Sequence, residues 1–316
     1  MPDQLPQITK KQHWVPQFYL KKFANDEGKL KVLEIAKGRV LKKDYAPSAV
    51  CYDDFFYGVE TGKQDEVSQM VEDVFQQIEN SAATLHPIWC KKILNYEQLS
   101  DQDLFQLSQF MSMLWIRSSY FRNQVQRQEE KITKETMSMV ARMMPAKQLD
   151  NALGKKAGEI SKKEEEEVRK TLAEGKYDLK FNNATHLGLL ESMEKFSNLI
   201  FHKKWRICLT SLGQTNLSFI TSDTPVVEVF PQQKRFYGYS FMERVHHFAL
   251  SPKILIILVN NTLPGKKVKR SQLKSDDGVH NYNATRLNWS EDYAYSGSEE
   301  EFNHALKFFK GQKSAV

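Results

Sequence analysis

The sequence predicts an α+β fold, in which a mainly antiparallel sheet is built from the N- and C-terminal segments and a long helical insertion lies in the middle. Two observations carry this prediction. Strand-like patterns occur in residues 1–60 and again in 201–316, whereas apolar residues recur at helical spacing within 61–200. No internal repeat and no Pro- or Gly-rich linker separates these parts. We therefore expect a single elaborated domain over residues 1–316.

The strand predictions rest on alternating apolar residues and on turn residues. Residues 29–43 (KLKVLEIAKGRVLKK) predict a hairpin that turns at Lys37-Gly38, and residues 53–59 predict a short strand. A second hairpin is expected from residues 205–209 and 217–221, which flank the turn-like segment SLGQTN. Further strands are expected at residues 226–230, 247–250, 254–259 and 293–295.

Helical spacing predicts a helix from Gln64 that Pro87 ends, and a second long helix that Ser100 caps. Residues 129–199 are expected to be helical and more polar, with a solvated, highly charged face at 161–170. Methionines in this region, at positions 137, 139, 143 and 144, are expected to pack in a core. Two more helices are predicted near residues 279–287 and 299–309.

Composition excludes several classes of protein. The 316 residues are 41% hydrophobic and 27% charged, which is typical of a globular chain and not of a disordered one. No segment has the roughly 18–20 consecutive apolar residues of a membrane span, and the first residues lack the apolar core of a secretory signal. The three cysteines lie far apart and suit free thiols. We expect a cytoplasmic protein without a membrane partner, whose formal charge of +6 permits an anionic one.

His13 is the first candidate site residue. Pro16 and the aromatic residues after it would hold the local backbone, so the imidazole is expected to be fixed in place. A fixed histidine can act as a general base, a metal ligand or a cation facing phosphate. The alternative is a histidine that hydrogen-bonds to the backbone and anchors the N-terminal segment.

Asp223 is the second candidate. It follows the apolar segment 217–221, and Pro225 forces the preceding residue out of the helical region. Asp223 is thus expected at the tip of a strand, a common position for catalytic or metal-binding carboxylates. The alternative is an Asx-turn in which Asp223 caps its own loop.

Glu72 and Glu79 lie seven residues apart in the first predicted helix, so they share a face and are separated by about 10 Å along the axis. One could serve a site while the other makes a supporting bond, or both could be ordinary exposed glutamates. Arg117 and Arg122 close the set in the segment WIRSSYFR. About 140° of helix rotation separates the two arginines, so only one faces a given site unless the helix breaks. Either arginine could bind phosphate or pair with Glu72 or Glu79.

Positive charge outside this set suggests a nucleic-acid surface. The residues concerned are Lys203, Lys204, Lys266, Lys267, Lys269 and Arg270, although solvated loops have the same composition. The chain lacks the P-loop, GxGxxG, HExxH and GxSxG motifs, which argues against nucleotide-fuelled, Rossmann, zincin and α/β-hydrolase chemistry. No nucleotide or organic cofactor is expected.

Several motifs resemble a known family. They are the opening QHWVPQFYL, the helix segment VEDVFQQIENSAA with its glutamates, and the segment Thr221-Ser222-Asp223-Thr224-Pro225. They are similar to the bacterial family catalogued as domain of unknown function 4238. The family usually shows Arg-Thr-Pro-x-Phe-Arg where this chain has Ser118-Ser119 between its arginines. The resemblance implies a bacterial protein, often carried on mobile or prophage-like elements, with a role in conflict with phage. It implies no established chemistry.

The candidate residues together suggest a metal-dependent phosphodiester hydrolase, a nuclease-like effector. In this hypothesis Asp223 and Glu72 or Glu79 hold Mg²⁺ or Mn²⁺. His13 moves a proton, and Arg117 or Arg122 stabilises charge on the phosphate. The alternative is a non-enzymatic sensor or binding module, in which the same residues form a structural polar cluster.

Overall fold

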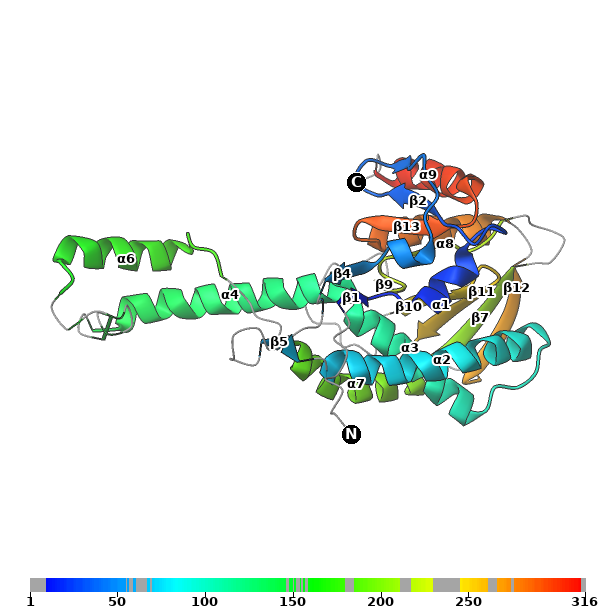
Figure 1. Cartoon of the computed structure of the whole chain (residues 1–316), viewed down its shortest axis with the longest axis horizontal. Coiled ribbons are helices and arrows are strands. Elements are labelled where there is room, and N and C mark those ends of the chain that lie inside the picture. Colours follow the sequence, from blue (N-terminus) through cyan, green and yellow to red (C-terminus); the bar gives the residue numbers. More distant parts are fainter. Residues whose placement is uncertain are drawn as a thin grey trace, which may run out of the picture. The chain divides into compact units, whose positions relative to one another are not determined.

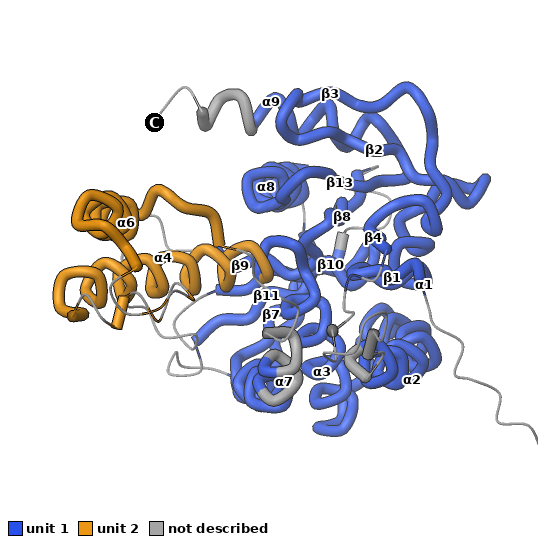
Figure 2. Tube along the Cα trace, turned by 60° about the vertical axis from the view of Figure 1, so that its left-hand side comes forward, with its two compact units in different colours: residues 1–121, 183–316 blue, residues 122–182 orange. Residues whose placement is uncertain are grey.

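The computed structural model describes residues 10–54, 56, 59–60, 67–68, 70–145, 148–149, 151, 154, 156, 159–179, 185–210, 217–229, 245–260, 266–273 and 276–313. Contacts divide the chain into two compact units, the first formed by residues 1–121 and 183–316 and the second by residues 122–182 (Figure 2). Helices and strands are both present, and most strand pairs are antiparallel, which confirms the predicted α+β class.

The larger sheet of the first unit has five strands in the order β12-β7-β11-β10-β9. All neighbours pair antiparallel except β12 and β7, which are parallel. The central strands are apolar and buried on both faces, which explains their continuous hydrophobic runs. The strands are β7 (Lys204–Thr210), β9 (Val226–Val229), β10 (Val245–Ser251), β11 (Ile254–Val259) and β12 (Val268–Leu273).

The second sheet joins the two ends of the chain, as predicted. Its order is β3-β2-β13-β8, so the N-terminal hairpin pairs through β2 with a strand close to the C-terminal helix. The strands are β2 (Lys31–Glu34), β3 (Arg39–Val40), β8 (Thr221–Ser222) and β13 (Tyr293–Ser296). Two short pairs accompany it: β1 (Lys11–His13) with β4 (Tyr52–Asp54), and β5 (Val59–Glu60) with β6 (Val67–Ser68). The single sheet expected from the sequence is therefore divided.

The predicted hairpin of residues 205–209 and 217–221 is wrong. Strand β7 pairs with β11 and β12, whereas β8 pairs with β13 in the other sheet. The turn segment SLGQTN itself lies outside the described residues. Two strands adjacent in sequence thus enter different sheets, because each finds its partner in a segment distant along the chain.

Helices of the first unit flank both sheets. Helices α2 (Met70–Leu94), α3 (Asp101–Arg117) and α7 (Thr185–His202) pack together, and α3 lies against the five-stranded sheet, where Phe110 meets Phe248 (Figure 1). Helices α8 (Asp276–Trp289) and α9 (Glu299–Lys313) pack together beside the four-stranded sheet. The short α1 (Gln17–Leu20) follows β1. Ser100 caps α3 in a capping box with Asp103, as its sequence predicts.

Helix α2 does not end at Pro87. It continues to Leu94, and Trp89 and Ile93 beyond the proline are fully buried in the core. Burial of two large side chains offsets the one backbone hydrogen bond that a proline removes. The start predicted at Gln64 lies outside the described residues.

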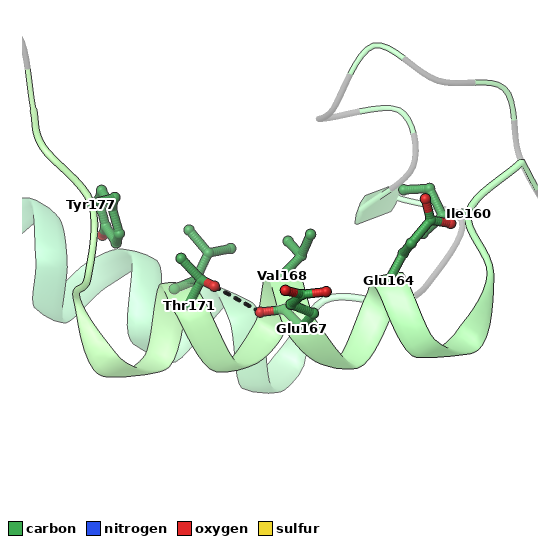
Figure 3. Close-up of a pocket in the computed structure, with 7 residues that line it drawn as sticks. Ile160, Glu164, Glu167, Val168, Thr171 and Tyr177 are labelled. Atoms are coloured by element: carbon green, nitrogen blue, oxygen red, sulfur yellow. Dashed lines mark hydrogen bonds between the residues drawn. The ribbon is translucent and has the colours of Figure 1, made fainter.

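The second unit contains most of α4 (Ser119–Met143) together with α6 (Lys162–Glu174). Arg169 of α6 donates hydrogen bonds to the carbonyl oxygens of Ala141 and Met144, which ties the helices together. Helix α6 buries no residue completely, in agreement with its expected solvated face. Figure 3 shows Glu164, Glu167, Val168 and Thr171 of α6 in a shallow pocket between Ile160 and Tyr177.

The methionines of α4 do not pack in a core. Met137, Met139 and Met143 are exposed, whereas Ala141 on the same helix is buried. Helix α6 contacts the face of α4 that carries Ala141 and Ser138, and Met139 and Met143 face away from it.

Asn283 provides a test of this fold. Its side-chain amide, buried in α8, accepts a hydrogen bond from the Ile220 N–H (3.1 Å) and donates one to the Ser218 carbonyl (2.9 Å). Asn283→Ala leaves both backbone groups without these partners. We expect it to lower the free energy of unfolding by about 2–4 kcal/mol in urea denaturation. The matched control is Asn281→Ala at an exposed position of the same helix, expected to change it by less than about 0.5 kcal/mol. Equal effects of the two substitutions would contradict this role.

Candidate functional site

The N-terminal segment is fixed by strand pairing. His13 lies opposite Tyr52 in the β1–β4 pair, and their ring centroids are 5.4 Å apart. His13 Nε2 lies 3.4 Å from both the Ser48 carbonyl oxygen and Gln17 Nε2. Burial lowers the pKa of His13, and the Ser48 carbonyl only partly opposes this shift. The imidazole is thus held in place and is neutral near pH 7.

Arg117 is the buried centre of the predicted residues. Its guanidinium, at the end of α3, donates hydrogen bonds to the Glu79 carboxylate and to the backbone carbonyl of His13. It also lies 4.8 Å from the centroid of the Phe75 ring, a cation–π contact. The Arg117 side chain is 1% exposed. It therefore forms the salt bridge that the sequence left as one of two alternatives, and it links β1, α2 and α3.

Glu72 lies on α2 two turns before Glu79 and is 7% exposed. Its Oε2 atom is buried and has no hydrogen-bond partner among the described residues. Burial raises the pKa of Glu72, and the positive charge of Arg117 opposes this shift. His13, Glu72, Glu79 and Arg117 thus come together from three elements. We call these four residues the polar cluster.

Arg117 ends α3 in the first unit, whereas Arg122 lies near the start of α4 in the second unit. The chain leaves helical geometry at Ser118 (φ −61°, ψ 143°), so α3 and α4 are separate helices. The helix break between the two arginines, which the sequence left open, is therefore present. Arg122 is nevertheless the first residue of the second unit, and it is described with that unit.

Asp223 binds a loop that is distant in sequence. Its carboxylate accepts hydrogen bonds from the backbone N–H groups of Glu291 (3.1 Å), Asp292 (2.6 Å) and Tyr293 (2.8 Å). These three residues connect α8 to β13, so Asp223 fixes the entry to β13. The local turn is closed instead by Ser222, whose hydroxyl accepts from the Thr224 N–H. The Asx-turn that the sequence left as the alternative, in which Asp223 caps its own loop, is thus replaced by a long-range cap.

The environment of Asp223 shifts its ionisation. Burial raises the pKa of Asp223 to about 6, and the three backbone N–H groups oppose the shift. Both carboxylate oxygens already accept hydrogen bonds, and Glu79 is paired with Arg117. Within the described part of the chain, no group of three His, Cys, Asp or Glu side chains is arranged to hold a metal ion. The Mg²⁺ or Mn²⁺ ion stays a prediction that these contacts do not support.

A cavity of about 270 Å³ lies beside Asp223. Its wall carries two carboxyl groups, those of Asp223 and Asp292, and the Cys51 thiol, which donates a hydrogen bond to the Tyr295 hydroxyl (3.2 Å). Burial raises the pKa of Cys51, so the thiol is protonated. We call this space the tyrosine cavity, because five aromatic side chains line it: Trp14, Tyr45, Tyr52, Tyr293 and Tyr295.

The tyrosine cavity adjoins the polar cluster. Tyr52 lines the cavity and also contacts the His13 ring, and Trp14 in the cavity wall is the next residue after His13. Sequence reasoning missed the cavity. Its one local signal is the Tyr-x-Tyr spacing of Tyr293 and Tyr295, which places both side chains on the same face of β13.

A second buried arginine was also missed. Arg286 of α8 is fully buried and donates hydrogen bonds to the Tyr282 hydroxyl and to the Thr224 carbonyl. In the same region the Tyr19 hydroxyl donates to the Ala249 carbonyl (2.7 Å). These bonds satisfy buried backbone carbonyls next to Asp223 and hold β8, β10 and α8 together.

The basic residues predicted to bind nucleic acid differ in their environments. Lys203 is fully buried, which does not suit a phosphate contact. Lys267 lies over the Phe201 ring and 3.4 Å from Asp101, and Arg270 donates to the Glu97 carbonyl. The remaining three, Lys204, Lys266 and Lys269, are partly or fully exposed.

Comparison with known proteins places the chain in a family. A family model described as "Protein of unknown function (DUF4238)" matches residues 11–300. The chain belongs to this family. This member has an α+β fold, with a buried arginine–glutamate pair and an aromatic cavity. No curated protein and no solved structure matches the chain. None of the helices in the described ranges is both long and apolar enough to cross a membrane.

The raised pKa of Asp223 predicts a pH dependence. Folded protein keeps a proton on Asp223 up to about pH 6, whereas the unfolded chain releases it near the ordinary value of about 4. This group therefore adds stability as the pH falls from 7 to 4. Asp223→Asn removes that gain and also two charge-assisted acceptors. We expect a loss of about 1–3 kcal/mol at pH 7 and about 2 kcal/mol more at pH 4.

Urea denaturation of both proteins at the two pH values measures these differences. Asp26→Asn, at an exposed position, is the matched control. A stability difference between wild type and Asp223→Asn that is the same at pH 7 and pH 4 would show that Asp223 does not titrate in this way.

Proposed function

We propose that this chain is a binding protein for a nucleotide, whose base enters the tyrosine cavity. The aromatic lining carries the proposal. Flat heterocycles stack on tyrosine and tryptophan faces, and each such contact contributes about 1–3 kcal/mol. A cavity of about 270 Å³ is of the size that a single base with part of its sugar requires.

The polar groups of the cavity support a nucleobase rather than a plain hydrocarbon. The exposed Asp292 lines the cavity, and its carboxyl oxygens can accept hydrogen bonds from the amino and ring N–H groups of a base. Positive charge lies over two of these rings: the Lys11 amine is 4.7 Å from the Tyr52 centroid, and the Lys43 amine is 5.9 Å from the Tyr45 centroid. Two exposed lysines beside the cavity suit the phosphate of a nucleotide, free or at the end of a single strand.

The fluorescence of Trp14, which lines the cavity, can be used to measure this binding. We expect a nucleoside monophosphate to quench tryptophan fluorescence saturably, because the base would stack beside Trp14. Tyr52→Ala should weaken binding about tenfold or more, since it removes one stacking face. Trp14→Phe should abolish the quenching signal, whereas Trp289→Phe, outside the cavity wall, should keep it. Absence of saturable quenching by AMP, GMP, CMP and UMP, together with unchanged melting temperatures, would contradict the proposal.

A second candidate function is hydrolysis of a phosphodiester bond beside this cavity. The buried Oε2 of Glu72, which has no hydrogen-bond partner among the described residues, favours it. Burial raises the pKa of Glu72 and lowers that of His13, so the pKa values of these two groups in one cluster move toward each other. Arg117 fixes Glu79 and the His13 backbone and so positions the pair. A nuclease-like effector in phage defence is the role that such chemistry would serve in this family.

Glu72→Gln tests the second candidate because it keeps the shape and removes the proton-transfer group. We expect cleavage of a fluorescent oligonucleotide or of bis(p-nitrophenyl) phosphate to fall by a factor of about 10²–10⁴. Asp73→Asn, exposed on the same turn of α2, is the matched control and should retain activity. Wild-type protein without cleavage, or full activity in Glu72→Gln, would leave nucleotide binding as the function.

A further inference from the structure

A basic groove lies on the first unit, apart from the tyrosine cavity. Its volume is about 550 Å³. Three lysines line it, and each comes from a different segment: Lys22 from the 3₁₀ turn after α1, Lys91 from the last turns of α2, and Lys253 from the turn between β10 and β11. The fold thus brings together three positive charges that are far apart in sequence.

Among the residues that the structure describes, no carboxylate pairs with these lysines. The residues that line the groove include no Asp or Glu. Within the described ranges, none of the three amines forms an ion pair with a carboxylate of the chain. Like charges held near one another repel, and a convergent set of them attracts anions by the same field. An empty groove of this kind is less favourable than one that holds a counter-charge.

The floor of the groove is built from α2 and the β10–β11 turn. Pro87, Leu94 and Pro252 supply apolar surface, and Leu94 is 38% exposed. The buried His86 lies beneath, where its Nε2 donates to the Leu250 carbonyl (2.8 Å). Burial is the main cause that lowers the pKa of His86, and the Lys22 charge lowers it further. The positive charge of Lys22 therefore acts on His86, which lines the groove.

We propose that the basic groove binds a small phosphorylated compound with at least two negative charges. Its phosphate lies among Lys22, Lys91 and Lys253, and the Ser251 hydroxyl lines the same space. The apolar part of the compound rests on Pro87 and Leu94. This site is independent of the tyrosine cavity, with which it shares no lining residue.

Inorganic pyrophosphate is the probe for this site. Melting temperature and isothermal titration are followed as pyrophosphate increases, with KCl adjusted to hold the ionic strength constant. We expect a saturable rise in melting temperature for the wild type. Lys22→Gln/Lys91→Gln should weaken pyrophosphate binding at least tenfold. Both lysines are exposed, so the double variant should stay folded, which circular dichroism checks.

The matched control is Lys162→Gln/Lys195→Gln, which removes two exposed lysines outside the groove and should bind pyrophosphate as the wild type does. Trp14→Phe should also bind pyrophosphate normally, which separates this site from the nucleotide proposal. The proposal is overturned if both double variants lose affinity equally, or if the melting temperature rises without saturation. It is also overturned if a single-stranded oligonucleotide, and not pyrophosphate, shows the dependence on Lys22 and Lys91.

Discussion

The candidate site depends on the hydrogen bonds that the buried guanidinium of Arg117 donates. A charge taken out of water is tolerated only when it is fully paired, and breaking such a pair costs about 3–5 kcal/mol. Arg117 meets this requirement by bonding to the Glu79 carboxylate and to the His13 carbonyl. Those two bonds hold α2 against α3 and fix the strand that carries His13. Trp14 comes directly after His13, and Tyr52 lies opposite His13 in the paired strand β4. One wall of the tyrosine cavity therefore depends on the same ion pair.

Several buried charged side chains of this protein hydrogen-bond to backbone groups, so their first role is structural. Both carboxylate oxygens of Asp223 accept hydrogen bonds from the turn before β13. The Arg286 guanidinium donates hydrogen bonds to a backbone carbonyl and to a tyrosine hydroxyl. From the sequence alone such residues resemble catalytic ones, because the same charged residue types serve both structural and catalytic roles. What remains accessible is the surface beside them, which includes aromatic side chains of the tyrosine cavity and the Asp292 carboxyl. Ligand binding is therefore better supported than catalysis by the predicted residues themselves.

Local patterns predicted local structure well. The hairpin at 29–43 and the capped start of α3 depend on turn and cap residues within a few positions, and both are present. The hairpin at 205–221 failed because strand partners are chosen by distant segments, and Pro87 failed to end α2 because burial of Trp89 outweighs a local preference. Family motifs indicated the residues of the polar cluster. The tyrosine cavity escaped notice, because its walls come from Tyr45, Tyr52 and β13, which no periodicity connects.

The pairing of β2 with β13 has a consequence for how the chain is made. Residues 31–34 leave the ribosome long before their partner at residues 293–296 is synthesised. Until then one edge of β2 has no strand beside it, and exposed edges favour association with other chains. At about 5–20 residues per second, this interval lasts for many seconds. During this interval the free edge of β2 in the nascent chain can pair with other chains unless another protein covers it.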